Sequence, residues 1–201
     1  MGLFDGIREV LGMAAEADAG RDADPEDLFG MSTAYMTMQA ELGYEHADVA
    51  ALCFSSVDST SFDAALDDVR DILAAGEAET GTISNVTTDS QGYQWVVLQD
   101  SDPEDLVTSV HFAADTFVEH DFGSRLLAAV FGFEKDGEPA YWVYSFRRGS
   151  YYPFAPRAGR ERDTSTEFKL QSVLDGELEI EDDTSYWYPL WPSRSGAHPW
   201  E

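Results

Sequence analysis

The stretch LLAAVFGFEKDGEPAYWVYSF, residues 126–146, is the part of this 201-residue chain that decides its fold. Two apolar runs, residues 126–133 and 140–146, flank the turn-rich tetrapeptide 134–137. Apolar runs on either side of such a turn predict a β-hairpin. The second run is apolar or aromatic on both of its faces, which predicts a strand that is central in a sheet or covered on both sides.

Further strands and helices are predicted on either side of this hairpin. About five strands interleaved with helices, several of them joined by hairpin turns, predict an α+β fold with helices packed on a mostly antiparallel sheet. A parallel sheet of βαβ units is the less favoured arrangement. The other predicted strands cover residues 49–54, 81–87 and 93–98, and the predicted helices begin at Asp24 and Asp102, span the apolar positions 62–73, and cover 166–174.

The pentapeptide Asp-Pro-Glu-Asp-Leu occurs twice, at residues 24–28 and 102–106. In each copy the first Asp can cap a helix, Pro suits the first helical position, and the acids favour the positive end of the helix. A strand candidate follows each copy after about 25 residues. Two interpretations are open: the repeat is the trace of a duplication into two similar halves, or the two copies are independent helix starts. The second interpretation is favoured.

The two ends of the chain are expected to lie outside a single α+β domain of residues 25–191. Residues 14–24 are small and acidic and indicate a linker, and residues 192–201 form a C-terminal tail. Residues 1–13 predict an amphipathic helix, which either contacts a membrane or a partner or packs on its own domain. Its apolar face comprises Leu3, Phe4, Ile7, Val10 and Leu11.

Composition limits the possible environments and partners. The formal net charge is −27, with 39 Asp and Glu against 12 Lys and Arg, and such dispersed acidity is typical of a halophilic, salt-adapted surface. Nucleic-acid binding is disfavoured because phosphates would be repelled by the acidic surface. The single cysteine, Cys53, lies in an apolar run and predicts a buried thiol in a cytoplasmic protein. No apolar run approaches the roughly 20 residues that span a bilayer.

The cationic residues are concentrated in one place. Five of the twelve lie within residues 147–162, around an aromatic segment. Arginines beside aromatic rings are typical of partner-binding surfaces. The alternative is that the arginines pair with the chain's own acids while the rings fill the end of the sheet. The predicted partner-binding residues are Arg147, Arg148, Tyr151, Tyr152 and Phe154, joined by Trp187, Tyr188 and Trp191 from a second aromatic segment.

Catalytic chemistry is not indicated by any motif. The histidines lack the spacing of a zinc site, and neither a phosphate-binding glycine loop nor a nucleophile elbow is present. We therefore expect no catalytic residues, no metal and no cofactor. His111 and Asp115 lie one helical turn apart, which favours a surface hydrogen bond over a ligand pair.

Three segments carry a resemblance to a known family. The opening Met1-Gly2-Leu3-Phe4-Asp5, the segment RRGSYYPFAP at 147–156 and the segment WYPLW at 187–191 resemble the PspA-associated protein PspAB family, in a haloarchaeal-type member. The resemblance implies an accessory protein of a phage-shock-like membrane stress response, without established catalytic residues. It implies a PspA-like protein or an HtpX-type membrane protease as partner, and it suggests a link to secretion-chaperone-like α+β folds.

The function expected from these observations is that of a non-enzymatic adaptor. It would bind a protein through the Arg/aromatic segment and lie in the cytoplasm or peripherally at the inner face of the cell membrane. The alternative is a small-ligand-binding protein or enzyme, with a pocket between the sheet and the aromatic C-terminal segment.

Overall fold

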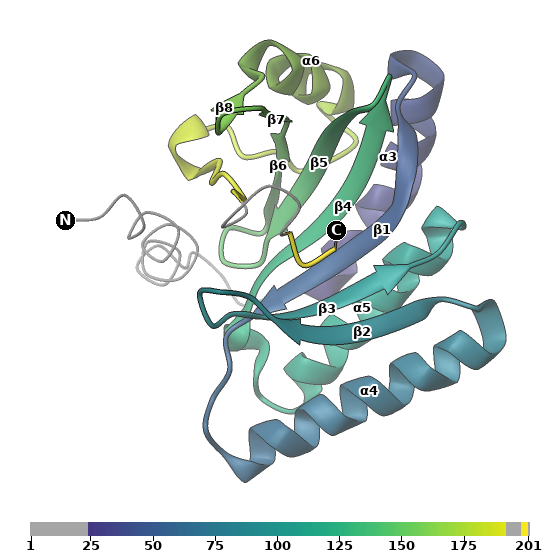
Figure 1. The fold of residues 1–201 in the computed structure, drawn as a ribbon, viewed down its shortest axis with the longest axis vertical. Coiled ribbons are helices and arrows are strands. Elements are labelled where there is room, and N and C mark those ends of the chain that lie inside the picture. Colours follow the sequence, from purple (N-terminus) through teal and green to yellow (C-terminus); the bar gives the residue numbers. More distant parts are fainter. Residues whose placement is uncertain (1–23, 192–197, 201) are drawn as a thin grey trace.

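A computed structural model describes residues 24–191 and 198–200 of the chain (Figure 1). Its centre is a six-stranded antiparallel sheet with the strand order β2-β3-β1-β4-β5-β6. The α+β prediction is confirmed, with one strand more than expected. The strands are β1 (Glu45–Phe54), β2 (Ile83–Thr88), β3 (Gln94–Gln99), β4 (Leu126–Lys135), β5 (Glu138–Ser145) and β6 (Ser150–Phe154), and a separate two-stranded sheet pairs β7 (Pro156–Arg157) with β8 (Glu161–Arg162).

The predicted hairpin is the β4–β5 pair. Lys135 pairs with Glu138, so Asp136 and Gly137 alone form the turn. Both turn residues have positive φ, 55° and 81°, as a type I′ turn requires. This turn matches the right-handed twist of the strands and fixes their register, which places alternate β5 side chains on opposite faces of the sheet.

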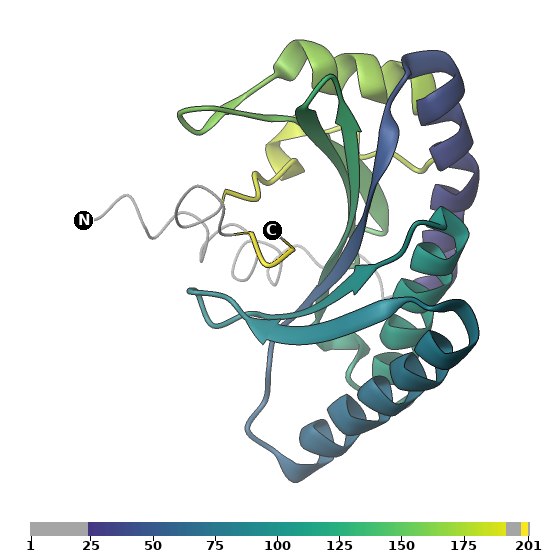
Figure 2. The ribbon, with the colours of Figure 1, turned by 45° about the vertical axis from the view of Figure 1, so that its right-hand side comes forward.

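Helices α3, α4 and α5 cover one face of the sheet, as Figure 2 shows. The described helical elements are η2 (Pro25–Phe29), α3 (Gly30–Thr37), η3 (Met38–Leu42), α4 (Thr60–Thr80), α5 (Pro103–Glu119), η4 (Gly123–Arg125), α6 (Thr164–Leu174) and η5 (Thr184–Tyr186). Most of the buried apolar side chains lie between these helices and the sheet, and this layer is the main hydrophobic core.

The repeated pentapeptide starts a helical element in both places. Asp24 accepts a hydrogen bond from Glu26 N and begins the 3-10 turn η2, whereas Asp102 accepts one from Glu104 N and begins α5. The strands that follow, β1 and β4, are neighbours at the centre of the sheet. The order of elements then differs, because β1 is followed by a helix and β4 directly by two more strands. The likeness of the two halves is limited to a capped helix and a central strand.

Side chains of β5 are buried on both faces, as its composition predicts. Trp142 and Tyr144 belong to the core under the helices. Tyr141 and Val143 point to the other face, where they pack with Trp187, Leu190 and Trp200 from the end of the chain. Figures 1 and 2 show this C-terminal segment on the face opposite to the helices. The sheet therefore has a second apolar layer, formed by the last part of the chain.

Strand β6 is the strand of the six-stranded sheet that the sequence did not predict. It contains Pro153, which cannot donate a hydrogen bond to a neighbouring strand, and it follows an Arg-Arg-Gly turn. Proline is tolerated here because β5 is the only strand of the sheet that pairs with β6, which lies at the end of the sheet.

The domain limits can be compared with the described part of the chain. The predicted N-terminal helix and all but the last residue of the predicted linker lie outside it. His198 and Trp200 belong to the predicted tail, but both are buried against the sheet. Trp200 packs on Trp95 and Tyr141, with ring centroids 5.4 and 5.5 Å apart, so it is part of the folded unit.

Candidate partner-binding site

The predicted site begins at the turn between β5 and β6. Ser145 pairs with Ser150, and Gly149 has a φ of 64° and donates its N–H to Ser145 O at 2.7 Å. A positive φ favours glycine at this position. The turn brings Arg147 and Arg148 to the end of the sheet, with both side chains half-buried.

The three rings that follow this turn are buried. Tyr151, Tyr152 and Phe154 expose 2% or less of their surface, so the expectation that they face a partner from the surface is wrong. Their burial follows from alternation along β6. Tyr151 enters the core under the helices, where its hydroxyl donates to Asp27 O and Leu28 O, while Tyr152 and Phe154 enter the layer under the C-terminal segment.

Arg148 is fixed by two contacts within the chain. Its Nε donates to Glu181 Oε2 at 2.8 Å, and its guanidinium lies 3.9 Å from the centre of the Tyr186 ring. Arg147 donates from Nη2 to Ser124 O at 2.6 Å, while its buried Nε has no hydrogen-bond partner among the described residues. Both side chains therefore bind groups within the chain, as the alternative interpretation of the sequence expected.

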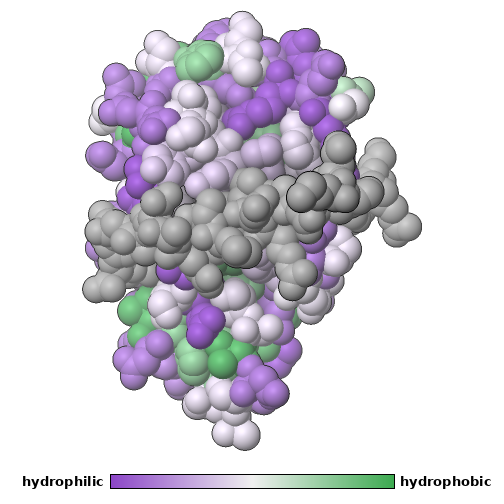
Figure 3. Space-filling view, turned by 90° about the vertical axis from the view of Figure 1, so that its left-hand side faces the viewer, coloured by the Kyte–Doolittle hydropathy of each residue, from purple (hydrophilic) through white to green (hydrophobic). Residues whose placement is uncertain are grey.

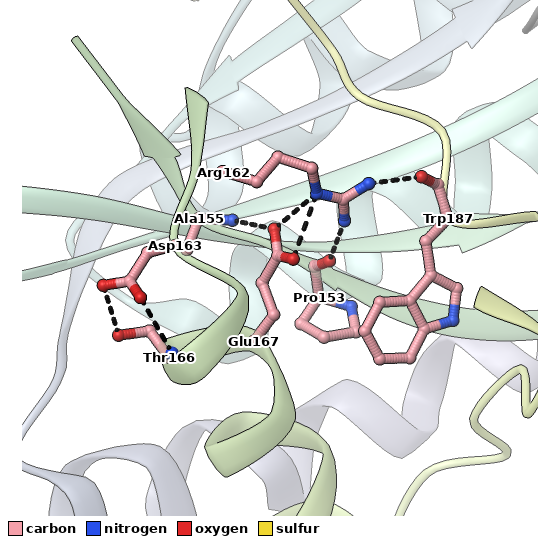
Figure 4. Close-up of polar contacts among 7 residues, drawn as sticks. All are labelled: Pro153, Ala155, Arg162, Asp163, Thr166, Glu167 and Trp187. Atoms are coloured by element: carbon pink, nitrogen blue, oxygen red, sulfur yellow. Dashed lines mark hydrogen bonds and ion pairs between the residues drawn. The ribbon is translucent and has the colours of Figure 1, made fainter. Parts of the chain in front are cut away.

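Arg162 is the centre of a buried network, drawn in Figure 4. Its Nε donates to both carboxylate oxygens of Glu167, at 2.8 and 3.0 Å, and its two terminal nitrogens donate to the carbonyls of Pro153 and Trp187. Glu167 is 2% exposed and also accepts the N–H of Ala155. Burial raises the pKa of the Glu167 carboxyl, although the Ala155 N–H and the Arg162 guanidinium oppose the rise. The network joins β6, α6 and the C-terminal segment.

Arg157 differs from Arg162 because it lies at the surface. It pairs with Asp163. Burial by itself would raise the pKa of this carboxyl, but the hydrogen bonds from Thr166 and Arg157 together outweigh that effect and lower it. Asp163 also caps α6 through Thr166 N. The arginine segment, residues 147–162, therefore contains a buried ion pair at Arg162 and a solvated one at Arg157, and its charges do not form one free patch.

The second aromatic segment is partly buried as well. Trp187 is 4% exposed, and its Nε1 donates to Glu181 O at 2.8 Å. Tyr188 and Trp191 are half-buried, and the Trp191 ring packs on Phe154 at 5.1 Å. This segment covers the sheet directly. The gap beside Trp200 is lined mainly by apolar groups of β1 and β4 and leaves no room even for a water molecule, whereas a typical small-molecule site has at least roughly 300 Å³.

A pocket of about 400 Å³ opens beside the β5–β6 turn. Arg148 lines it from the β5–β6 turn, Ser150 from β6 and Asp27 from η2, and the segment 179–182 closes its other side. Four of its lining residues, Asp27, Glu179, Glu181 and Asp182, are acids. Because carboxylates outnumber the single guanidinium, the pocket favours a cationic group from outside the chain.

Comparison with known families assigns the chain. The model of the family described as PspA associated protein B matches residues 1–200. The chain belongs to this family. A search of curated proteins found no match to it. The family name links this PspAB member to PspA and supports an accessory role.

Three other features of this PspAB member concern membrane, metal and thiol chemistry. In the described part of the chain, no helix is both long and apolar enough to cross a membrane. Within residues 24–191 and 198–200, no group of three or more His, Cys, Asp or Glu side chains is arranged to hold a metal ion. Cys53 is fully buried, and burial raises the pKa of its thiol.

An exposed aromatic pair on the helical face of this PspAB member was not predicted. Phe29 and Phe112 are 40% and 47% exposed, and the buried His111 ring lies between them, 4.5 and 5.7 Å from their ring centroids. His111 Nε2 lies 3.1 Å from Glu26 Oε1, so its partner is Glu26 and not the Asp115 that the sequence suggested. No helical spacing within one element could reveal this pair, because η2 and α5 are brought together only by folding.

Proposed function

We propose that this chain is a non-enzymatic adaptor of a PspA-linked stress response, and that it acts by binding a PspA-like protein. The match to the PspA associated protein B family over residues 1–200 is the observation that carries the proposal. An HtpX-type protease is the second candidate partner. Peripheral membrane contact through residues 1–13 rests on the sequence pattern alone.

The pocket beside Arg148 is the contact surface that we assign to this function. Arg148 is held between Glu181 and the Tyr186 ring, so the side chain loses little freedom when a partner binds. Glu179 and Asp182 lie at the surface on the rim of the same pocket. A lysine or arginine of the partner would enter among the carboxylates, which gives electrostatic steering and a salt-dependent affinity.

The test is a binding titration with a purified PspA-family protein. The variant Glu179→Gln/Asp182→Asn keeps the shape of the pocket and removes two charges. We expect it to bind about tenfold more weakly and with a smaller salt dependence, because rim charges contribute mainly through long-range attraction. Glu104→Gln/Glu119→Gln on the exposed face of α5 is the matched control, since it removes the same charge at a distance from the pocket.

Two outcomes would contradict the proposal at different levels. Equal affinities of the pocket variant and the wild-type chain would remove the pocket from the function. If the wild-type chain bound neither a PspA-family protein nor an HtpX-type protease, the adaptor function itself would be wrong.

A further inference from the structure

The two edges of the six-stranded sheet are treated differently. The β6 edge contains Pro153 and is closed by the segment after α6, since Tyr151 N donates to Glu179 O and Glu181 N donates to Tyr151 O. The β2 edge has no such cover: among the described residues, no strand or extended segment pairs with its outer side. One edge is sealed, and the other presents unpaired backbone groups.

Strand β2 has no charged residue, no proline and no bulge to protect its edge. Natural edge strands carry charges, proline or bulges, which discourage pairing with another chain. The sequence of β2 is Ile-Ser-Asn-Val-Thr-Thr, without a charge or a proline, in a chain that has 39 Asp and Glu among 201 residues. Its register with β3 runs from Ile83 to Thr88 without a bulge. The strand is therefore a regular, neutral template for strand addition.

The direction of the backbone groups of β2 follows from its turn. Asp89 donates its N–H to Tyr93 O at 2.9 Å, so Asp89 faces the neighbouring strand β3. Antiparallel strands alternate, and residues one position away face the opposite side. Ser84, Val86 and Thr88 thus direct their N–H and C=O groups outward, away from β3.

Both ends of β2 are held in place by side-chain hydrogen bonds. At the start, Thr82 donates from Oγ1 to Asp100 Oδ2. At the end, Asp89 accepts from Gln91 N, Tyr93 N and the Trp95 indole at 2.8–3.0 Å. A strand that is already fixed at both ends loses little conformational entropy when another strand pairs with it.

The acidic residues of helix α4, next to β2, favour a positively charged partner. Helix α4 packs against β2 and carries six acids, Asp63, Asp67, Asp68, Asp71, Glu77 and Glu79, against the single base Arg70. A second copy of the chain would bring another −27 charge and a second acidic α4 to the edge, which electrostatics disfavours. A basic segment would be attracted.

The opposite face of β2 is uncharged and carries Ile83. Ile83 is 55% exposed on the face away from the helices. Figure 3 views the molecule from the side of the β2–β3 turn and shows hydrophobic groups among hydrophilic ones in the lower part of that side. A strand next to β2 would place alternate side chains beside α4 and beside Ile83, and so basic residues would alternate with apolar ones.

We propose that the outer edge of β2 binds an extended basic segment of a partner protein by strand addition. The added strand pairs with Ser84, Val86 and Thr88, directs its lysines or arginines toward α4, and directs its apolar side chains toward the face of Ile83. This surface is separate from the pocket beside Arg148, and the proposal stands independently of the PspA-linked function.

The test uses a fluorescent heptapeptide of alternating lysine and valine, with a glutamate–valine peptide as the charge control. Ser84→Pro removes one outward N–H, whereas Ser84→Ala keeps it. We expect Ser84→Pro to weaken binding of the lysine peptide at least about tenfold and Ser84→Ala to leave it within about twofold of the wild-type chain.

A second variant covers the case in which Ser84→Pro does not fold, as judged by circular dichroism. Glu77→Gln/Glu79→Gln on α4 leaves the strand intact and is expected to weaken binding of the lysine peptide with a reduced salt dependence. The proposal is overturned if the glutamate peptide binds as tightly, if no binding occurs up to about 1 mM lysine peptide, or if Ser84→Pro, once folded, binds normally. Concentration-dependent dimerisation that Ser84→Pro abolishes would assign the edge to a second copy and also overturn it.

Discussion

Replacing Arg162 with alanine should destabilise the chain by more than any other single loss of charge in the arginine segment. The change leaves the carboxylate of Glu167, which is 2% exposed, without its ion-pair partner and removes the donors to Pro153 O and Trp187 O. Breaking a buried pair by removing one partner costs about 3–5 kcal/mol, and the lower value applies because the Arg162 side chain is itself 20% exposed. For a domain of this size, about 3 kcal/mol corresponds to a decrease in Tm of roughly 6–12 °C.

The loss should also depend on pH, in a direction fixed by Glu167. Burial already raises the pKa of this carboxyl in the folded state, and removal of Arg162 raises it further. A group with a raised folded pKa favours the folded state when it is protonated, and this contribution disappears as the pH rises through that pKa. The difference in Tm between the variant and the wild-type chain should therefore be larger at about pH 7.5 than at about pH 5.

Thermal unfolding followed by circular dichroism, at one salt concentration and both pH values, measures these differences. The double variant Arg162→Ala/Glu167→Gln should recover part of the loss, since it no longer buries an unpaired charge. Arg70→Ala is the control: its pair with Asp67 is half-exposed, and such pairs contribute at most about 1 kcal/mol. A decrease in Tm below about 2 °C for Arg162→Ala, or an equal decrease at both pH values, would refute the reasoning.

Three further predictions follow from the packing and from the sequence. Gly132→Ala should lower the free energy of unfolding by about 1–3 kcal/mol, because the new Cβ would lie 2.9 Å from Val49 Cγ1 and 3.3 Å from Ala47 Cβ. Urea unfolding measures this free energy, and an unchanged midpoint would contradict the prediction. Trp200→Ala should lower the free energy of unfolding by about 3 kcal/mol in the same assay, since the Trp200 ring packs on Trp95, Tyr141 and His198. A smaller decrease than that of the solvent-exposed control Phe168→Ala would show that the end of the chain does not stabilise the sheet. Deletion of residues 2–13 should reduce co-sedimentation with anionic lipid vesicles if the N-terminal segment binds membranes, and equal partition of the two forms would remove that expectation.

Local signals in the sequence were enough for most of the fold. The β4–β5 hairpin follows from its apolar runs and turn residues, and the starts of η2 and α5 follow from the capping Asp24 and Asp102. These features depend on neighbouring residues only. Strand β6 could not be predicted from neighbouring residues. Pro153 and the preceding arginines are typical of a loop, and the segment becomes a strand through its pairing with β5.

The candidate site was located less well than the fold. The sequence singled out residues 147–162, and in the structure Arg148 lines a pocket. The sequence could not indicate which side chains of this segment are buried. The burial of Tyr152 and Phe154 depends on the C-terminal segment, which Arg162 fastens through Trp187 O. These contacts join residues that are distant in the chain, and no periodicity within one segment indicates them.

The adaptor function is tested most directly by sedimentation velocity of the purified chain mixed with a purified PspA-family protein. We predict that the two proteins co-sediment as a complex of defined stoichiometry, and that the complex weakens as the salt concentration rises. Two independently sedimenting species at about 100 μM of each protein would contradict it.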